Sequence, residues 1–496
     1  MRKHILPQGL MNGRAYLVLS FSYEFHVVPI DPSISLNCSA VDPTIDNKRQ
    51  HFKLLVVGGG AAGMGASHKF ARKLPKFSVG VVEPNTNSEH FQVLVVGGSD
   101  AGMGWISRTQ CTRLDMVTHY YQPGFTMVGG GMMTLKSNTA QQKDLIHPKT
   151  VWIQDRVVKF DPARNAVKLT NGDEVTYDYM IIATGVQLRW DMIKGLPEAL
   201  DTPGVCSNYS PLHCEKTFKE LSSVTSGNCV FTFPNTPIKC AGAPQKVCYY
   251  GEDIVRDRGY RNSTNFIYAT ALPRLFGVEA YLKALNKVAA EKNIDVRTHH
   301  SLVEVDVNSK IAKFELLDDN SKPNGKFDEI PYSLLHIGPP CSTPPAVRAC
   351  SELTDENGWV DVDHETLRSK HFANVFGAGD CMNTPNAKTA AAVSSHLKTI
   401  EKNLAAVMEG REPPACYDGY ASCPIVISRK RAILAEFNSK GRMETTPLEQ
   451  SIPRRHQFWM KLYLMPFLYW RFLVKGHWNG PATIRKILHL GFTPRK

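Results

Sequence analysis

With 496 residues the chain is too long for one hydrophobic core, and about 100–200 residues per domain predicts two or three units. Hydrophobic residues make up 43% and charged residues 21%, as in an ordinary globular protein. No apolar run reaches the roughly 18 residues of a membrane-spanning helix. The net charge of +12 predicts an anionic partner, namely a small anion, a nucleic acid or an acidic lipid surface. Twelve scattered cysteines without a Cys-x-x-Cys pair argue against a zinc site or a disulfide framework.

The first fifty residues have the composition of a targeting segment. Arg2, Lys3 and Arg14 precede the first acidic residue, Glu24, which loosely fits a mitochondrial presequence. A poorly ordered tail, or a signal peptide whose apolar stretch is Ala15 to Phe21, fits the same composition, and both alternatives stay open.

Strands and helices alternate after this segment. The apolar run FKLLVVG at residues 52–58 predicts a buried parallel strand, followed by a glycine turn, a helix over 64–73 and a strand over 78–82. Further strands are predicted over residues 179–183, 228–233, 265–268 and 374–376, with a helix over 278–292. This order predicts an α/β fold with a doubly wound parallel sheet.

One segment is repeated. Residues 91–104 (FQVLVVGGSDAGMG) closely copy residues 52–65 (FKLLVVGGGAAGMG), but Ser99 replaces the glycine that matches Gly60. We therefore expect the inserted partial repeat, 85–118, not to form a second nucleotide site. A lineage-specific insertion and a duplicated exon both explain it.

The glycine turn carries a dinucleotide fingerprint. Gly58, Gly60 and Gly63 have the spacing Gly-x-Gly-x-x-Gly after a strand, with Ala61 and Ala62 between them. Glu83 ends the next strand, where a carboxylate accepts hydrogen bonds from the adenosine ribose. The alternative, a glycine-rich turn without a ligand, does not account for this complete context.

Two later motifs also place small residues after an apolar strand. They are YDYMIIATG, which ends at Gly185, and NVFGAGD, which ends at Asp380. Together with the first turn they resemble the FAD-binding motifs of two-dinucleotide-domain flavoproteins. The resemblance implies that Asp380 contacts the ribityl chain of FAD and that Thr184 and Gly185 pass near the cofactor. It also implies an FAD-binding domain of residues 51–190 plus 346–430 and a second Rossmann-like domain of residues 191–345.

The second domain lacks a nicotinamide fingerprint. The strand over 228–233 runs into a loop with Pro234 and Pro237, which disfavours the cradling of a phosphate by consecutive amides. NAD(P)H is therefore not the expected electron donor. Cys240 lies in this loop and Cys381 follows Asp380, so a thiol is the expected electron donor to the flavin.

Most free cysteines are buried small hydrophobic residues, and we expect this of the other ten, including Cys423 and Cys341. For Cys240 and Cys381 the same alternative exists. Basic neighbours such as Lys239, Lys246 and Lys388 favour reactive thiols instead.

Several stretches resemble the eukaryotic mitochondrial type of sulfide:quinone oxidoreductase. They are FTFPNTPIKCAGAPQK, FGAGDCMNTPNAKTAAAV, HYYQPGFTMVGGG, YDGYASCP and LMPFLYW. The resemblance implies that Cys240 lies against FAD and that Cys381 is its more accessible partner, joined by a disulfide or a sulfur-bridged link. Hydrosulfide then attacks at Cys381, a persulfide forms there, and a thiol or sulfite removes the sulfane sulfur. Gln122, Val157 and Lys388 match family positions near the cofactor.

The resemblance also implies that reduced FAD passes two electrons to a membrane quinone, ubiquinone, at the mitochondrial inner membrane. The aromatic segment 458–478, within a C-terminal region of residues 431–496, suits a peripheral or monotopic contact, and Pro466 predicts its division into two short helices. An ordinary C-terminal helical hairpin packed on the core is the alternative. No nucleic acid partner is then expected. A type II NADH:quinone dehydrogenase and a flavoprotein disabled by the insertion remain the rival functions.

Overall fold

The computed structural model describes residues 16–21, 24–29, 49–84 and 118–490, which fall into two compact units. The first unit comprises residues 1–47 and 85–117, and its described part is an antiparallel hairpin of β1 (Tyr16–Phe21) and β2 (Glu24–Pro29). The copied segment at residues 91–104 and most of the predicted presequence lie outside the described residues. The second unit comprises residues 48–84 and 118–496 and carries the predicted functional residues.

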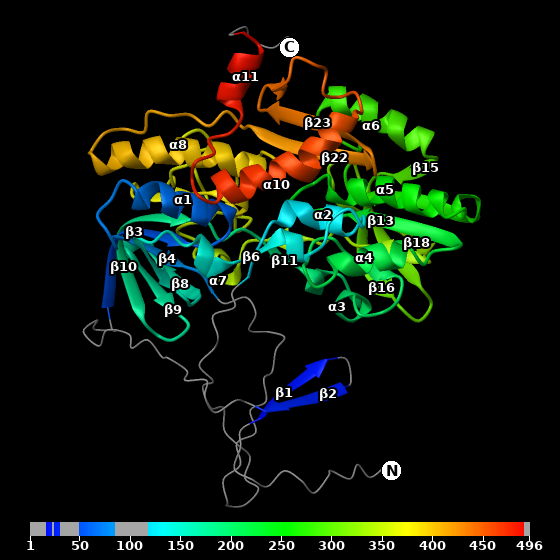
Figure 1. Ribbon diagram of the computed structural model, residues 1–496, viewed down its shortest axis with the longest axis horizontal. Coiled ribbons are helices and arrows are strands. Elements are labelled where there is room, and N and C mark those ends of the chain that lie inside the picture. The colour runs from blue at the N-terminus through cyan, green and yellow to red at the C-terminus, as the bar shows by residue number, and fades with distance from the viewer. Residues whose placement is uncertain (1–15, 22–23, 30–48, 85–117, 491–496) are drawn as a thin grey trace, which may run out of the picture. The chain divides into compact units, whose positions relative to one another are not determined.

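A seven-stranded sheet opens the second unit (Figure 1). Its central strand, β3 (Arg49–Val57), lies between β4 and β10, and its apolar residues 54–57 are buried, as expected of a strand covered on both faces. The order is β7-β4-β3-β10-β9-β8, and β21 pairs in parallel with β10. The remaining strands are β4 (Val79–Val82), β7 (Thr150–Ile153), β8 (Val157–Asp161), β9 (Ala166–Leu169), β10 (Glu174–Ile182) and β21 (Val375–Gly377).

Two helices lie together on one side of this sheet. Helix α1 (Ala61–Ala71) packs against α8 (Ala390–Met408), and both lie above β3 and β4 in Figure 1. Helix α1 begins at Ala61, three residues before the predicted helix, with Gly60 as its N-cap residue. The side chain of Thr389 caps α8 by accepting a hydrogen bond from the backbone N–H of Ala392.

A second parallel sheet has the order β12-β19-β13-β14-β15. Its central strand, β13, is followed by the long helix α5. Helix α6 corresponds to the helix predicted over 278–292 and differs from it by one residue at each end. The predicted α/β class is therefore confirmed. These elements are β12 (Val205–Cys206), β19 (Leu334–His336), β13 (Gly227–Phe233), β14 (Thr264–Thr270), β15 (Ile294–Arg297), α4 (Cys214–Leu221), α5 (Ala243–Asp257) and α6 (Glu279–Glu291).

Two antiparallel sheets complete the second half of the unit. One consists of β16 (His300–Asp306), β17 (Ile311–Leu317) and β18 (Pro323–Pro331). The other consists of β22 (Ala421–Ser428), β23 (Arg431–Asn438) and β24 (Gly441–Arg442), and β22 packs on α5. The predicted boundary between the FAD-binding domain and the C-terminal region, after residue 430, falls in the turn between β22 and β23. This sheet therefore has strands on both sides of that boundary.

The shorter elements connect these layers. They are β5 (Thr118–Tyr120), β6 (Thr139–Gln141), β11 (Gln187–Leu188), β20 (Cys341–Ser342), α2 (Phe125–Val128), α3 (Leu196–Ala199) and α7 (Pro345–Arg348).

The chain stays helical from Arg455 to Leu473, which we call the tail helix. It comprises α9 (Arg455–Trp459), a π-helical turn (Met460–Leu464), α10 (Met465–Leu468) and a second π-helical turn (Tyr469–Leu473). The predicted break at Pro466 is wrong. Proline lacks an N–H group and crowds the carbonyl four residues earlier, and π turns on both sides accommodate this because their bonds span five residues.

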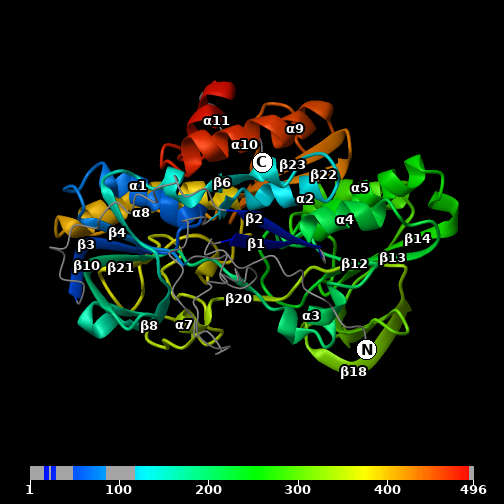
Figure 2. The same ribbon diagram turned by 60° about the horizontal axis from the view of Figure 1, so that its bottom comes forward.

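The tail helix lies across α1 and α2 in both views (Figures 1 and 2). It is followed by α11 (Ala482–Leu488). Within the described ranges, no helix combines the length and the hydropathy needed to cross a membrane.

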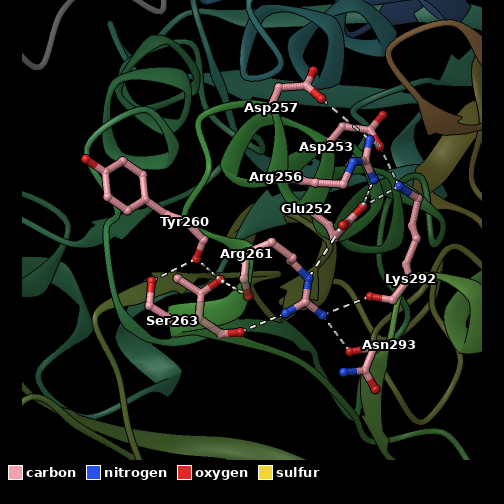
Figure 3. A network of polar contacts seen from close by, with 10 residues as sticks. Glu252, Asp253, Arg256, Asp257, Tyr260, Arg261, Ser263, Lys292 and Asn293 are labelled. Carbon is pink, nitrogen blue, oxygen red and sulfur yellow. Dashed lines mark hydrogen bonds and ion pairs between the residues drawn. The ribbon is translucent and has the colours of Figure 1, made fainter.

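An ionic cluster with buried carboxylates lies at the C-terminal end of α5. Figure 3 shows Arg256 and Lys292 converging on the carboxylates of Glu252 and Asp253, and Lys292 Nζ lies 2.6 Å from an oxygen of each. The other carboxylate oxygen of Asp253 accepts the backbone N–H of Arg429 at 2.9 Å. Asp253 therefore ties α5 to the turn between β22 and β23.

We expect Asp253→Ala to lower the free energy of unfolding by about 1–3 kcal/mol, because it leaves the backbone N–H of Arg429 without its acceptor and removes one of the two carboxylates that Lys292 contacts. Asp257→Ala is the matched control, since Asp257 lies on the same helix but its side chain is 60% exposed. It should change stability by less than about 0.5 kcal/mol. Differential scanning calorimetry of the two variants measures this, and equal losses would contradict the role of the cluster.

Candidate active site

The glycine turn is shaped by close backbone contacts between β3, α1 and β10. Gly58 has φ +113°, and a Cβ there would lie 2.4 Å from the carbonyl oxygen of Ala183. A Cβ on Gly63 would lie 1.7 Å from the carbonyl oxygen of Gly58. Larger residues at either position would force the strand ends and α1 apart.

The space beside this turn suits a phosphate-containing cofactor. Among the described residues, no atom lies within 4 Å of a Cβ built on Gly60 or on Gly185. Helix α1 begins there with Ala61. Its N-cap residue, Gly60, has no side chain to bond the first N–H groups of the helix. Backbone N–H groups at a helix N-terminus bind phosphate oxygens. The turn therefore fits the pyrophosphate of FAD.

Glu83 lies directly beside the turn. Its carboxylate accepts a hydrogen bond from the backbone N–H of Gly59, and burial raises the pKa of Glu83 to about 7. The amide of Gln142 donates to the carbonyl oxygen of Gly59 at 3.0 Å. The N–H and the carbonyl oxygen of Gly59, the residue before Gly60, are thus each held by a side chain.

Two other predicted cofactor segments meet the turn. Strands β10 and β21 are paired, so Thr184 and Asp380, which follow their carboxyl ends, lie at the same edge of the sheet. Gly379 has φ +80°, and a Cβ there would lie 3.1 Å from the Cβ of Ala62. Val157 is the buried first residue of β8 in the same sheet.

Two lysines, the buried Lys388 and the partly buried Lys239, act on the charge of Asp380. Burial raises the pKa of the Asp380 carboxyl, and the positive charges of Lys388 and Lys239 oppose that rise. Lys239 Nζ donates to Gln122 Oε1 at 2.7 Å. Lys388 Nζ donates to the carbonyl oxygen of Met382 at 2.8 Å and lies 4.2 Å from the centre of the Trp359 ring. Gln122, Asp380 and Lys388 are thereby brought to one place.

Cys240 lies in the loop that joins β13 to α5, with φ +53°. This conformation is sparsely populated for a residue other than glycine and often marks a functional site. Its backbone N–H donates to the carbonyl oxygen of Lys388 at 2.8 Å, and its carbonyl oxygen accepts the Tyr209 hydroxyl at 3.2 Å. Lys246 Nζ, in the first turns of α5, lies 3.4 Å from Sγ of Cys240.

The partner of Cys240 is Cys423 of β22. Their thiols share a hydrogen bond, and with the charges of Lys246 and Lys461 this bond lowers the pKa of Cys240 well below its usual value despite burial. The same bond, with burial, raises the pKa of Cys423. A Cβ on Gly242 would lie 2.6 Å from Sγ of Cys423, so glycine is needed there for the two thiols to approach.

Cys381 lies in a different environment. Its thiol is fully buried, and its Sγ lies 3.4 Å from the carbonyl oxygen of Ile182 and 3.5 Å from that of Ala378. Burial raises the pKa of Cys381. The prediction of an accessible thiol at Cys381 is therefore wrong, and the structure pairs Cys240 with Cys423 instead.

Cys423 stands in the sequence motif YDGYASCP. The sequence predicts a buried, unreactive cysteine there, because most free cysteines are of that kind. Lys461 lies within the aromatic segment 458–478, but it does not face solvent. It is only 3% exposed, donates to the carbonyl oxygen of Pro123 at 2.8 Å, and has its pKa lowered to about 7 by burial and by Lys246. The tail helix thus contributes a basic group to the thiol site.

Similar proteins fit this arrangement. The chain is 40% identical over 444 residues to the mitochondrial sulfide:quinone oxidoreductase of Mus musculus, a match that covers 89% of this chain and 91% of that protein. It is 35% identical over 436 residues to the mitochondrial sulfide:quinone oxidoreductase of Dictyostelium discoideum, covering 87% and 88%. The chain belongs to the mitochondrial sulfide:quinone oxidoreductase family. The predicted family is confirmed.

Two further comparisons agree with the fold. Residues 52–228 match the pyridine nucleotide-disulphide oxidoreductase family. The crystal structure of the sulfide:quinone oxidoreductase from Aquifex aeolicus aligns with a TM-score of 0.68 at 17% identity, covering 90% of this chain and 96% of that one. At this identity the likeness concerns the fold alone.

We expect Cys240 of the reduced protein to react with iodoacetamide at about pH 6, because a lowered pKa keeps its thiolate form as the pH falls. Cys416 is the comparison, since it is exposed and Glu365 raises its pKa. Its reaction should slow by roughly tenfold for each pH unit below its pKa. Mass spectrometry of the labelled peptides measures both rates. Parallel pH profiles for Cys240 and Cys416 would contradict a thiolate at Cys240.

Proposed function

We propose that this protein is a sulfide:quinone oxidoreductase of the mitochondrial inner membrane. It oxidises hydrogen sulfide, transfers the sulfane sulfur to a thiol or sulfite, and passes two electrons through FAD to ubiquinone. The observation that carries the proposal is the contact of Cys240 with the buried Cys423 and the buried Lys246. The names of the relatives support the activity and the compartment.

FAD would be held by residues 51–190 with 346–430, beside a second Rossmann-like domain of residues 191–345. The amides of the glycine turn would hold its pyrophosphate, Glu83 its ribose and Asp380 its ribityl chain. When bound, FAD supplies a two-electron acceptor beside the thiols. The positive charges of Lys239 and Lys388 would favour the negative charge that accompanies two-electron reduction.

The two thiols perform the sulfur chemistry from a resting state in which a disulfide joins them. Hydrosulfide attacks Sγ of Cys423, the disulfide breaks, and its electron pair leaves on the thiolate of Cys240. Lys246 and the N-terminus of α5 stabilise that thiolate. Burial favours the neutral amine of Lys246, but the Cys240 thiolate outweighs it and keeps the pKa of Lys246 above its usual value.

A thiol or sulfite then takes the outer sulfur from the Cys423 persulfide, which leaves Cys423 as a thiolate. Rejoining of the two thiolates as a disulfide releases two electrons, for which FAD, when bound, would be the acceptor on the way to the quinone. Oxidant and reductant balance, because hydrosulfide supplies two electrons and the quinone accepts two.

A type II NADH:quinone dehydrogenase is not favoured. Such an enzyme needs a phosphate-cradling turn between β13 and α5, and here that loop contains Pro234 and Pro237 and presents Cys240. Dehydrogenase activity with NADH is therefore not expected.

The outer face of the tail helix is the proposed membrane contact. Trp459, Tyr463 and Phe467 follow one another at four-residue spacing and are 63%, 64% and 52% exposed. In α11, Ile487 is 67% exposed. Aromatic side chains on one face of a short helical segment favour insertion into the interface of a bilayer. The basic residues of the segment favour an anionic leaflet.

Cys240→Ser and Cys423→Ser should each abolish quinone reduction by sulfide, because either change removes a sulfur of the proposed pair. Cys381→Ser should retain most of the activity, since the thiol of Cys381 lies in the core away from that pair. Spectrophotometric assay of ubiquinone reduction measures all three. Activity in Cys423→Ser together with its loss in FAD-loaded Cys381→Ser would contradict the proposed pair.

We expect Trp459→Ser with Phe467→Ser to weaken binding to anionic liposomes by at least about tenfold, because burying one large apolar side chain contributes about 1.5–3 kcal/mol. Phe327→Ser is the matched control, since Phe327 of β18 is 53% exposed but lies outside the tail helix. Co-sedimentation measures the effect. Unchanged binding of the double variant would contradict the assigned membrane face.

A further inference from the structure

Three buried hydrogen bonds join the glycine turn to the tail helix. Gln142 Nε2 donates to the carbonyl oxygen of Gly59 at 3.0 Å, and Gln142 Oε1 lies 2.9 Å from Nδ1 of His119. His119 Nε2 lies 2.7 Å from the hydroxyl oxygen of Tyr469. The three side chains are buried, with Gln142 1% exposed and the other two 5% exposed. No part of the sulfur chemistry uses them.

The direction of each bond follows from the chemistry of the groups. The amide nitrogen of Gln142 donates to Gly59, so its oxygen must accept, and Nδ1 of His119 must carry a proton. Burial lowers the pKa of His119 to about 4, which keeps the imidazole neutral with one N–H group. Nε2 is then an acceptor, and the Tyr469 hydroxyl donates to it at 2.7 Å rather than to the more distant carbonyl oxygen of Tyr120, at 3.3 Å. One proton arrangement therefore satisfies the whole series.

The segment that follows Tyr469 is tied to α1, the helix that begins at the turn. Arg72 donates to the carbonyl oxygens of Lys475 at 3.0 Å and Gly476 at 3.1 Å. Lys69 Nζ donates to Asn479 Oδ1 at 2.7 Å. A Cβ on Gly476 would lie 2.6 Å from the carbonyl oxygen of Gly65. The tail helix is therefore joined to the turn through His119 and Gln142, and the segment that follows it contacts the body of α1.

We propose that His119 and Tyr469 are positioning residues that couple the seating of FAD in the glycine turn to the docking of the tail helix. The inference rests on the proposed FAD site. Because coupling between two binding events is reciprocal, bound FAD protects the tail helix from undocking, and a docked tail helix strengthens FAD binding by the same factor.

The test compares Tyr469→Phe with Tyr463→Phe, a matched control whose side chain is 64% exposed on the same helix. Fluorescence titration of apoprotein gives the FAD dissociation constant, and cleavage by trypsin after Arg471 or Lys475 with and without FAD reports tail docking. Tyr469→Phe should weaken FAD binding by about fivefold or more and reduce the protection that FAD gives against trypsin. Tyr463→Phe should match the unsubstituted protein in both measurements.

A second variant covers the case in which Tyr469→Phe does not fold. His119→Asn keeps an amide near the position of Nδ1, and so keeps a donor to Gln142, but cannot reach Tyr469. It should reproduce the loss of tail protection, and the double variant should be no weaker than either single variant, because both break the same bond. Additive losses would overturn the coupling. Unchanged FAD affinity and tail protection in the single variants would overturn the inference and leave the proposed function standing. An unsubstituted protein that takes up no FAD overturns both.

Discussion

The buried ammonium group of Lys246 needs an anion beside it, and in the reduced protein Cys240 supplies that anion as a thiolate. Lys246 is almost completely buried with its Nζ at 3.4 Å from Sγ of Cys240. The loss of hydration of both ions is compensated only while the two stay together. Helix α5 supplies Lys246, the loop after β13 supplies Cys240, and β22 supplies Cys423. The packing of α5 on β22, fixed at its far end by Asp253, therefore determines whether the thiol site exists.

The tail helix serves two environments with two faces. Its inner face brings Lys461 to the thiols and Tyr469 to His119, and both side chains are buried. Its outer face exposes Trp459 and Phe467. The alternation follows from the helical repeat, which places residues three to four apart on one side. The tail helix, whose sequence predicts a membrane-interface segment, thus also packs in the core that supports the glycine turn.

Local patterns predicted the parts of the site that depend on local geometry. The glycine turn, Glu83 and the strand before Asp380 follow from short motifs, since a tight turn can be recognised from its glycines. The pairing of Cys240 with Cys423 depends on packing between segments far apart in the sequence, so burial alone suggested an inert cysteine. The predicted break at Pro466 was wrong for a related reason. Two π-helical turns, one on each side, accommodate the proline within a continuous helix, and no sequence pattern predicted these turns.

The identity of the cysteine that works with Cys240 is the central claim, because it decides where the sulfur is held. Peptide mapping of the protein without added reductant, after exposure to sulfide and excess ubiquinone, tests it most directly. The account predicts a cross-linked peptide that joins Cys240 to Cys423, with or without one extra sulfur atom. A cross-link between Cys240 and Cys381 would contradict it.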